Sequence, residues 1–473
     1  MVTPSSPTGR MSPVLLLAAT AITLGLISPG VHFDMLVVAA PVLAAALYDV
    51  RTTAFVGALT LVTFALLRLP LEEDHNATWI IKLALVVIVC LLCMLLSFIR
   101  MREEEFRRVR KTALRLQESL LPREFPDSSA VELGHRYVPA EAAVGLGGDW
   151  FDLIPLSGAR VALVMGDVVG HGPEAAATMG QLRTAVHTLA DLDQDPEEVM
   201  ATVDDLLQRM GQDRAQAELV ASCLFLVYDP ISRRCEYTSA GHPPPVFVMA
   251  DGEVFVQEDS RNPPLGFGNA PFDVTSCDLP EGSLIALYTD GLLGLRHRGA
   301  EEGLEELAAA INAGSGTLQD MCDRVLSALP TTSEDDVALL LARTRVLDPG
   351  HVRTWEFRAA VEEMPSVRAA VTGQLAEWDL DEHGFALEMV VCELVTNAVQ
   401  HAQGPIGLRL IRDLSLICEV SDTSSTAPHA RRADLMDEGG RGLYLVGQLM
   451  DRWGTRYTPR GKTIWASKYL GPV

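Results

Sequence analysis

The sequence GLGGDWFD at residues 145–152 and the sequence VMGDVVGHG at residues 164–172 each place an aspartate beside glycines. A buried carboxylate without a partner is costly, and a neighbouring glycine contributes no side-chain packing. Each stretch is therefore either a plain turn or part of a site that requires concentrated negative charge. The apolar residues before Asp167 predict a buried strand that ends at this carboxylate.

Residues 125–345 combine short apolar runs with longer amphipathic stretches. We predict strands over residues 160–168, 221–230, 244–250, 283–291 and 335–344. We predict helices over residues 173–192 and 196–210. Acidic residues stand at the strand ends or turns of this pattern: Asp149, Asp167, Asp290, Asp335 and Asp336. Carboxylates that are far apart in the sequence can thus converge at one end of a sheet.

This convergence is unfavourable without cations, because like charges about 4 Å apart repel by several kcal/mol at an intermediate dielectric. Two divalent ions convert the repulsion into binding, since carboxylate oxygens are suitable ligands for Mg²⁺ and Mn²⁺. Each aspartate alone is weak evidence: the dipeptide Asp290-Gly291 by itself is typical of a hairpin turn. The acids taken together favour a metal site.

Six motifs occur in order between residues 116 and 345: GGDWFD, GDVVGHG, SAGHPPP, PLGFG, LYTDGL and SEDDVALLLAR. This ordered set resembles the SpoIIE-like, PPM-type serine/threonine protein phosphatases of bacteria. The resemblance implies a β-sandwich flanked by helices, with two Mn²⁺ or Mg²⁺ ions at one end. It also implies the metal ligands, which are Asp149, Asp167, the backbone carbonyl of Val168, Asp290, Asp335 and Asp336.

Metal ions in such a pair lower the pKa of a bridging water, and the resulting hydroxide attacks phosphorus in line. The resemblance therefore makes Asp149 and Asp167 the expected catalytic residues. Many family members have a glutamate three residues after the Asp-Gly of LYTDGL, whereas this chain has Gly294. We expect that glutamate to lie outside the direct metal shell. For His171 and His242, which lie in the same motifs, we expect structural roles in turns.

A second pattern follows a linker at residues 344–351. Residues 385–403 predict an amphipathic helix with Glu393 and Asn397 on one face, since they are four positions apart. The stretch EGGRGLYLV at residues 438–446 predicts a glycine turn that opens a helix, which is a suitable phosphate cradle although GGRG alone is weak evidence.

These stretches, together with CEVSDTSSTAP at residues 418–428 and GKTIWASKYL at residues 461–470, resemble the GHKL-type ATPase fold over residues 353–470. The resemblance is specifically to the anti-sigma-factor serine kinases and implies an α/β sandwich that binds Mg-ATP. It implies that Asn397 holds Mg²⁺, Glu393 is a base and Asp422 binds the adenine amine, while the lid contains Gly439, Gly440 and Gly442. DTSST lacks the usual glycine after Asp422, so we expect ATP binding and leave kinase turnover open.

Residues 1–100 contain four apolar runs, at residues 13–28, 33–48, 52–67 and 79–99. Such lengths suit a bilayer about 30 Å thick, so we predict a four-helix transmembrane region rather than a secretory signal at the first run. The positions of Arg and Lys beside the runs predict a multi-pass protein of the cell membrane with both termini and both catalytic domains in the cytoplasm. For the pair Cys90 and Cys93, inside the last run, helix packing is favoured over a zinc or redox site.

Residues 101–124 are highly charged but keep a helical apolar spacing and end at prolines. They predict a stalk helix, which is either a solvated linker or a helix that dimerises the chain. The formal net charge of −24, from 62 acidic and 38 basic residues, argues against nucleic acid as a partner.

The leading hypothesis is a membrane-anchored phosphatase that acts on phosphoserine or phosphothreonine of a regulatory protein, namely an anti-sigma-factor antagonist. The kinase-like domain would rephosphorylate that partner or bind its sigma factor. The alternative is a catalytically silent partner-switch scaffold, whose ATP-binding domain sequesters a sigma factor or antagonist. Dephosphorylation by the metal-bound domain distinguishes the two.

Overall fold

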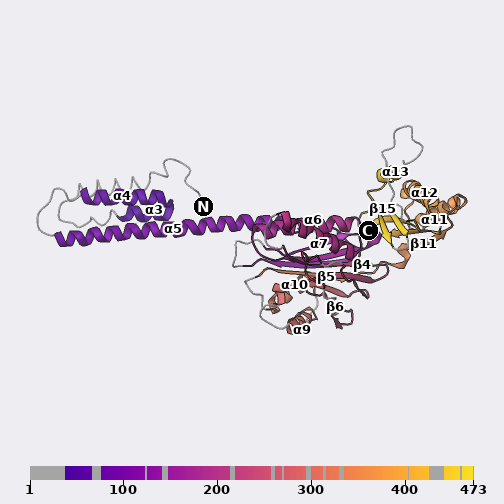
Figure 1. The fold of residues 1–473 in the computed structure, drawn as a ribbon, viewed down its shortest axis with the longest axis horizontal. Helices are drawn as coiled ribbons and strands as arrows, with labels where there is room; N and C mark the ends of the chain where they lie inside the picture. Colours follow the sequence, from indigo (N-terminus) through magenta and orange to yellow (C-terminus); the bar gives the residue numbers. More distant parts are fainter. Residues whose placement is uncertain are drawn as a thin grey trace. The chain divides into compact units, whose positions relative to one another are not determined.

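The computed structural model describes residues 38–66, 76–122, 125–140, 147–213, 219–256, 262–268, 271–293, 300–312, 316–329, 335–402, 404–424, 442–458 and 461–471. The chain forms two compact units, Met1–Thr112 and Ala113–Val473. The described part of the first unit is helical, and the described part of the second unit contains three five-stranded sheets (Figure 1).

The first unit is built from apolar helices, namely α3 (Ala39–Leu47), α4 (Val50–Leu66) and α5 (Asn76–Leu120). One segment of α5, Trp79–Glu104, is long and apolar enough to cross a membrane, and α4 is a shorter apolar helix. Small residues let α4 approach α5 closely: Gly57 lies against Cys90, and the Thr53 hydroxyl donates to Ser97 Oγ at 3.4 Å. Cys90 therefore has the packing role that the sequence favoured.

The described helices correspond to the predicted apolar runs and stalk. The last apolar run and the stalk form one uninterrupted helix, because residues 76–120 contain neither proline nor glycine. α3 covers Ala39–Leu47 of the predicted run at residues 33–48, of which residues 33–37 lie outside the described residues. The first apolar run, at residues 13–28, lies outside the described residues, so the four-helix transmembrane region stays a prediction.

The N-terminal part of the second unit is a β-sandwich of two antiparallel sheets. One sheet has the strand order β2-β3-β4-β5-β8, and the other has the order β1-β10-β9-β6-β7. The strands of the first are β2 (Trp150–Pro155), β3 (Val161–Val168), β4 (Ala221–Tyr228), β5 (Arg234–Ala240) and β8 (Thr275–Asp278). Those of the second are β1 (Val131–Val138), β6 (Val246–Val248), β7 (Val254–Phe255), β9 (Leu284–Tyr288) and β10 (Val337–Thr344).

Alternate residues of each strand face the two sides of the sheet, which produces three layers of core. Leu163 and Met165 of β3 pack against the other sheet, where they join Leu287 and Leu340. Their neighbour Val164 packs beneath α6 (Pro173–Asp191) and α7 (Pro196–Asp213). On the far side, α9 (Ala300–Asn312) and α10 (Leu318–Ala328) cover the second sheet. The predicted β-sandwich flanked by helices is therefore confirmed (Figure 1).

The C-terminal part of the second unit is a two-layer α/β structure. Its antiparallel sheet has the order β11-β12-β13-β15-β14, and helices α11–α13 pack on one face. The strands are β11 (Val352–Phe357), β12 (Ile406–Arg412), β13 (Ser415–Asp422), β14 (Arg452–Thr458) and β15 (Gly461–Tyr469). The helices are α11 (Met364–Glu377), α12 (Gly384–His401) and α13 (Gly442–Leu449).

Short turns of 3₁₀ helix occur in both parts of the second unit. η2 (Ser157–Ala159) lies between β2 and β3 of the sandwich. The others are η3 (Pro349–His351), η4 (Val361–Glu363) and η5 (Asp381–His383).

Candidate active site

The pairing of β2 with β3 brings Asp149 and Asp167 together. Their antiparallel register pairs Trp150 with Gly166, so Asp149, just before β2, faces Asp167 near the end of β3. Gly166 is required there, because a Cβ would lie 2.3 Å from the Trp150 ring. The N–H of Val168 donates to the carbonyl of the residue before Asp149 at 3.2 Å. Two acids of separate motifs thus share one end of a hairpin.

Two glycines let the main chain contact the carboxylates directly. A Cβ at Gly148 would lie 2.3 Å from the Val168 carbonyl oxygen and 2.9 Å from Asp167 Oδ1. A Cβ at Gly147 would lie 1.2 Å from Asp336 Oδ2. Neither position has room for a side chain, and the backbone between them contacts acids that come from both sheets of the sandwich.

The second sheet contributes the other acids. Asp290 begins α8 (Asp290–Leu293) just after β9, and Asp335 and Asp336 precede β10, which pairs with β9. Thr289 joins the two strands: its N–H donates to the Ala338 carbonyl at 3.1 Å, and its hydroxyl accepts from the Ala338 N–H at 2.9 Å. Asp290 and the Asp335–Asp336 pair are thereby positioned at one end of this sheet.

The electrostatics show that these acids influence one another. Burial raises the pKa of Asp149 well above its usual range, and the charge of Asp167 raises it further. Burial also raises the pKa of Asp167 to about 6, with contributions from the carboxylates of Asp290, Asp335 and Asp336. Negative charge is therefore concentrated at one end of the sandwich, at a free-energy cost that divalent cations would offset.

The donor chemistry fits divalent cations, although the carboxylates do not converge fully. Among the described residues, no three His, Cys, Asp or Glu side chains come close enough together to hold a metal ion. Asp149 Oδ2 is nevertheless buried, and it has no hydrogen-bond partner among the described residues, as expected of a ligand oxygen. Asp336 Oδ1 accepts from the Ala140 N–H at 2.8 Å. Metal binding would require some of these carboxylates to move together.

Tyr137, near the end of β1, belongs to the site but was not identified from the sequence. It forms a hydrogen bond with Asp336. Burial, followed by the charge of Asp336, raises the pKa of Tyr137, so the hydroxyl stays protonated and donates. The surrounding sequence, HRYVPA, has no pattern that distinguishes this tyrosine from a core aromatic residue.

The histidines of the motifs occupy different settings. His171 is exposed, just before α6. His242 is buried, and its Nδ1 lies 3.1 Å from the Pro243 carbonyl oxygen. Burial lowers the pKa of His242 to about 4, so its ring is neutral at physiological pH. Gly294, the departure from the family pattern, lies outside the described residues.

In the C-terminal part, Glu393 and Asn397 lie one turn apart on α12, and both are half-buried. Gly442 is the first residue of α13, and a Cβ there would lie 2.5 Å from Glu393 Oε2. The start of α13 therefore lies directly against the predicted base. Gly439 and Gly440 lie outside the described residues.

Asp422 ends β13 and is engaged by a lysine that the sequence analysis did not single out. Asp422 Oδ1 accepts from Lys462 Nζ at 3.1 Å and from the Ser424 N–H at 2.7 Å. The side chains of Asp422 and Lys462 are only 2% and 5% exposed. The residue predicted to bind adenine thus already has a buried cationic partner.

Comparison with known families agrees with this geometry. Residues 157–345 match the family described as Stage II sporulation protein E (SpoIIE). The chain carries a SpoIIE-type protein serine/threonine phosphatase domain. Residues 357–468 match the family described as Histidine kinase-like ATPase domain, so an ATPase domain of this type follows the phosphatase domain.

Individual relatives are similar to parts of this chain. Phosphoserine phosphatase RsbU of Bacillus subtilis (strain 168) is 22% identical over 251 residues, which cover 52% of this chain and 72% of RsbU. Phosphoserine phosphatase RsbP of the same organism is 27% identical over 153 residues, covering 32% of this chain and 38% of RsbP. A crystal structure of the RsbU and RsbW domains of a Mycobacterium tuberculosis protein is 29% identical, covers 74% of this chain and 96% of that chain, and has a TM-score of 0.43.

Proposed function

We propose that this chain is a membrane-anchored, metal-dependent phosphatase that removes phosphate from serine or threonine of an anti-sigma-factor antagonist. The observation that supports the chemistry is the gathering of five carboxylates from two sheets at one end of the sandwich. The raised pKa values of Asp149 and Asp167 and the unpartnered Asp149 Oδ2 are typical of a site prepared for cations.

Asp149, Asp167, the Val168 carbonyl, Asp290 and Asp335 would hold two Mn²⁺ or Mg²⁺ ions, with Asp336 as a further ligand. When bound, such ions neutralise phosphate oxygens and lower the pKa of a bound water. The chain itself positions the ligands. Gly147 and Gly148 leave the site open, because a side chain at either position would collide with it. Tyr137 and the Ala140 N–H orient Asp336 through hydrogen bonds.

The regulatory partner is inferred from relatives and from the second domain. The relatives RsbU and RsbP are named phosphoserine phosphatases. In the ATPase domain, Asn397 would hold Mg²⁺, Glu393 would act as base, and Asp422 would contact adenine beside a lid that contains Gly439, Gly440 and Gly442. That domain would rephosphorylate the antagonist or bind its sigma factor.

The membrane location is supported by the outer surface of α5. A soluble protein rarely exposes a continuous row of large apolar side chains. Over more than five turns, α5 exposes such residues, namely Ile80, Ile81, Leu85, Ile88, Leu91, Leu92, Leu95, Leu96, Phe98 and Ile99. A hydrocarbon environment would accept these side chains. The positions of Arg and Lys beside the apolar runs would then place the catalytic domains in the cytoplasm.

The experiment that tests the phosphatase is turnover of a phosphoserine peptide by the full chain in detergent with Mn²⁺. Wild type should release phosphate, EDTA should stop it, and Asp167→Asn should abolish it. Asp278→Asn is the matched control, because it removes an exposed carboxylate from the edge strand of the same sheet. Equal inactivity of wild type and Asp167→Asn with both Mn²⁺ and Mg²⁺ would refute the proposal.

The scaffold alternative is favoured by one observation, the incomplete convergence of the described carboxylates. A scaffold would bind the phosphorylated antagonist without releasing phosphate and would bind it equally well after Asp167→Asn. For the ATPase domain, Asn397→Ala should remove Mg-ATP binding. Unchanged nucleotide affinity in that variant would contradict the ATP site.

A further inference from the structure

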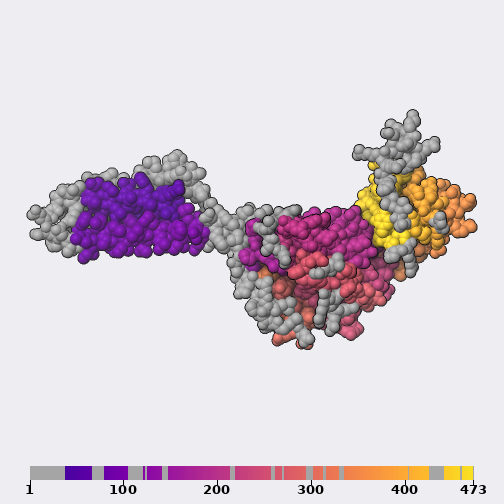
Figure 2. Space-filling view, in the orientation of Figure 1, coloured from indigo at the N-terminus to yellow at the C-terminus, as the bar shows by residue number. Residues whose placement is uncertain are grey.

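The sheet of the ATPase domain is covered on both faces. Its helices pack on one face, yet on the other face Ile417 and Trp465 are each only 6% exposed. They line one cavity together with Ser157, Gly158 and Arg160, which belong to the turn between β2 and β3. The space-filling view shows the two domains in direct contact (Figure 2). The face that the helices leave open is thus occupied by the chain's own phosphatase domain.

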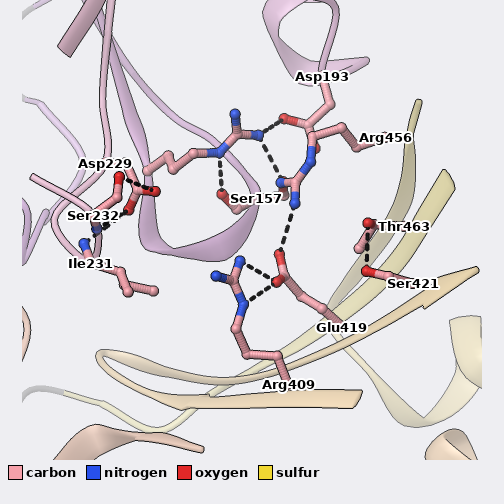
Figure 3. Close-up of polar contacts among 11 residues, drawn as sticks. Ser157, Asp193, Asp229, Ile231, Ser232, Arg409, Glu419, Ser421, Arg456 and Thr463 are labelled. Atoms are coloured by element: carbon pink, nitrogen blue, oxygen red, sulfur yellow. Dashed lines mark hydrogen bonds and ion pairs between the residues drawn. The ribbon is translucent and has the colours of Figure 1, made fainter. Parts of the chain in front are cut away.

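A buried carboxylate lies at the centre of this contact (Figure 3). Glu419 of β13 is 2% exposed, and its Oε2 accepts from Arg409 Nε at 2.5 Å. Arg456 of β14 approaches Glu419 Oε1 with its Nη2 at 3.5 Å. The other terminal nitrogen of Arg456 crosses to the phosphatase domain, where it donates to Ser157 Oγ at 2.6 Å.

The phosphatase domain holds the same serine from its own side. Arg160 Nη2 donates to Ser157 Oγ at 3.0 Å and to Asp193 Oδ1 at 2.7 Å. The Asp193 side chain is 3% exposed. One hydroxyl therefore receives a guanidinium from each domain. Separation of the domains would break the hydrogen bond between Arg456 and Ser157 and would expose to water the buried ion pairs on both sides of it.

The main chain makes its closest approach at Gly158. Gly158 has φ +67° and Ala159 has φ +64°, so the turn uses two left-handed residues. A Cβ at Gly158 would lie 2.8 Å from Glu419 Oε1 and 3.3 Å from Arg409 Nη2. Any larger residue at this position would push the hairpin away from the buried carboxylate.

Two further polar contacts surround the cluster. Arg452 pairs with Asp191 at 2.6 Å, but both side chains are about half exposed and contribute little. The Ser129 hydroxyl donates to Asp413 Oδ2 at 2.6 Å. The interface therefore has a buried ionic centre with polar contacts around it, and complementary charged and polar groups of this kind fix the register in which two surfaces meet.

Both elements that meet here extend to a proposed site. The β2–β3 hairpin carries Asp149 and Asp167 at its opposite end. β13 carries Glu419 three residues before Asp422, a separation of about 10 Å along a strand. We propose that the open face of the ATPase sheet is the docking surface for the phosphatase domain of the same chain, and that this contact transmits nucleotide binding to the hairpin that carries the phosphatase acids.

The docking is tested by hydrogen exchange of the full chain without nucleotide. In Gly158→Ala, the amides of residues 155–160 and of β13 should exchange about tenfold faster than in wild type. Gly252→Ala is the matched control: it also has a positive φ, of +90°, but nothing lies within 4 Å of its Cβ position. Arg456→Ala tests the same contact from the other domain and leaves the hairpin sequence intact. Wild-type protection in both Gly158→Ala and Arg456→Ala would overturn the docking.

The transmission rests on the proposed ATP site, so it is tested by adding Mg-ATP to the same proteins. In wild type, exchange should slow in α12 and also in the β2–β3 hairpin, whereas in Arg456→Ala it should slow in α12 alone. Protection confined to the ATPase domain of wild type would overturn the transmission and leave the ATP site standing. A lack of protection in α12 itself would overturn the ATP site and the transmission with it, while the comparison without nucleotide still decides the docking.

Discussion

Asp149 faces Asp167 at the end of the β2–β3 hairpin, one position beyond the paired residues Trp150 and Gly166. The pairing of the strands holds these two acids together, and burial raises the pKa of both. The fold thus maintains a charge arrangement that is unfavourable in the absence of cations. Sites that bind ions or perform catalysis commonly show such local instability.

Replacement of Asp167 by Asn should therefore have opposite effects on stability and on activity. Without metal, the change removes a buried charge that repels its neighbours, so the unfolding midpoint in EDTA at pH 7.5 should rise by a few degrees, or about 1 kcal/mol. With Mn²⁺, phosphate release should fall by about 100-fold or more. Thermal unfolding and peptide turnover measure the two effects. A lower midpoint than wild type in EDTA would contradict this account of the cluster.

Gly147→Ala should reduce turnover although it adds only a methyl group. The new Cβ would collide with Asp336 Oδ2, which lies 1.2 Å from its ideal position, so the carboxylate or the glycine backbone must shift. A displacement of about 1 Å in such a site lowers the rate by about 100-fold. Gly373→Ala is the control. Gly373 lies inside α11, and apart from the helix's own backbone nothing lies within 4 Å of the position that its Cβ would take, so turnover should be unchanged. Equal kcat/KM in the two variants would show that Gly147 is not needed for close approach.

The sequence was most informative where a strand is buried on both faces. The predicted run at residues 160–168 became β3, Val161–Val168, because one set of alternate residues faces the second sheet and the other faces α6. The helices predicted at residues 173–192 and 385–403 became α6 and α12 for a similar reason, since each buries one apolar face. The spacing of apolar residues reflects which faces of an element are buried, so it predicted the positions of these elements well.

Other features depend on contacts that periodicity does not encode. Tyr137 reaches Asp336 only because β1 pairs with β10, which follows it by about two hundred residues. Lys462 faces Asp422 because β13 and β15 are neighbours in the sheet. The contact of Arg456 with Ser157 depends on the docking of two domains. In each case the tertiary arrangement brings the two residues together, and no local sequence pattern predicts the contact.

His242 should make the folded state sensitive to acid. Its ring is buried, its Nε2 has no hydrogen-bond partner among the described residues, and its pKa is about 4 when folded. An unfolded histidine titrates near pH 6.5, so between these values the unfolded chain binds a proton that the folded chain does not. Stability is therefore fully retained above about pH 6.5 and falls by up to about 1.4 kcal/mol per pH unit below it. His242→Gln should flatten the dependence of the unfolding midpoint on pH between 6.5 and 4.5, and an unchanged slope would show that other groups cause it.

The buried pair of Lys462 and Asp422 should show strong coupling. Lys462→Met leaves Asp422 buried with its Ser424 N–H but without its cation, so the ATPase domain should lose about 3 kcal/mol of stability. Asp422→Asn in the same chain removes the orphaned charge, so the double variant should regain more than half of that loss. Hydrogen exchange of β13 and β15 in wild type, both single variants and the double variant measures the coupling. Additive losses would mean that the two side chains act independently, and Asp422 would then be held for nucleotide by its main-chain contact alone.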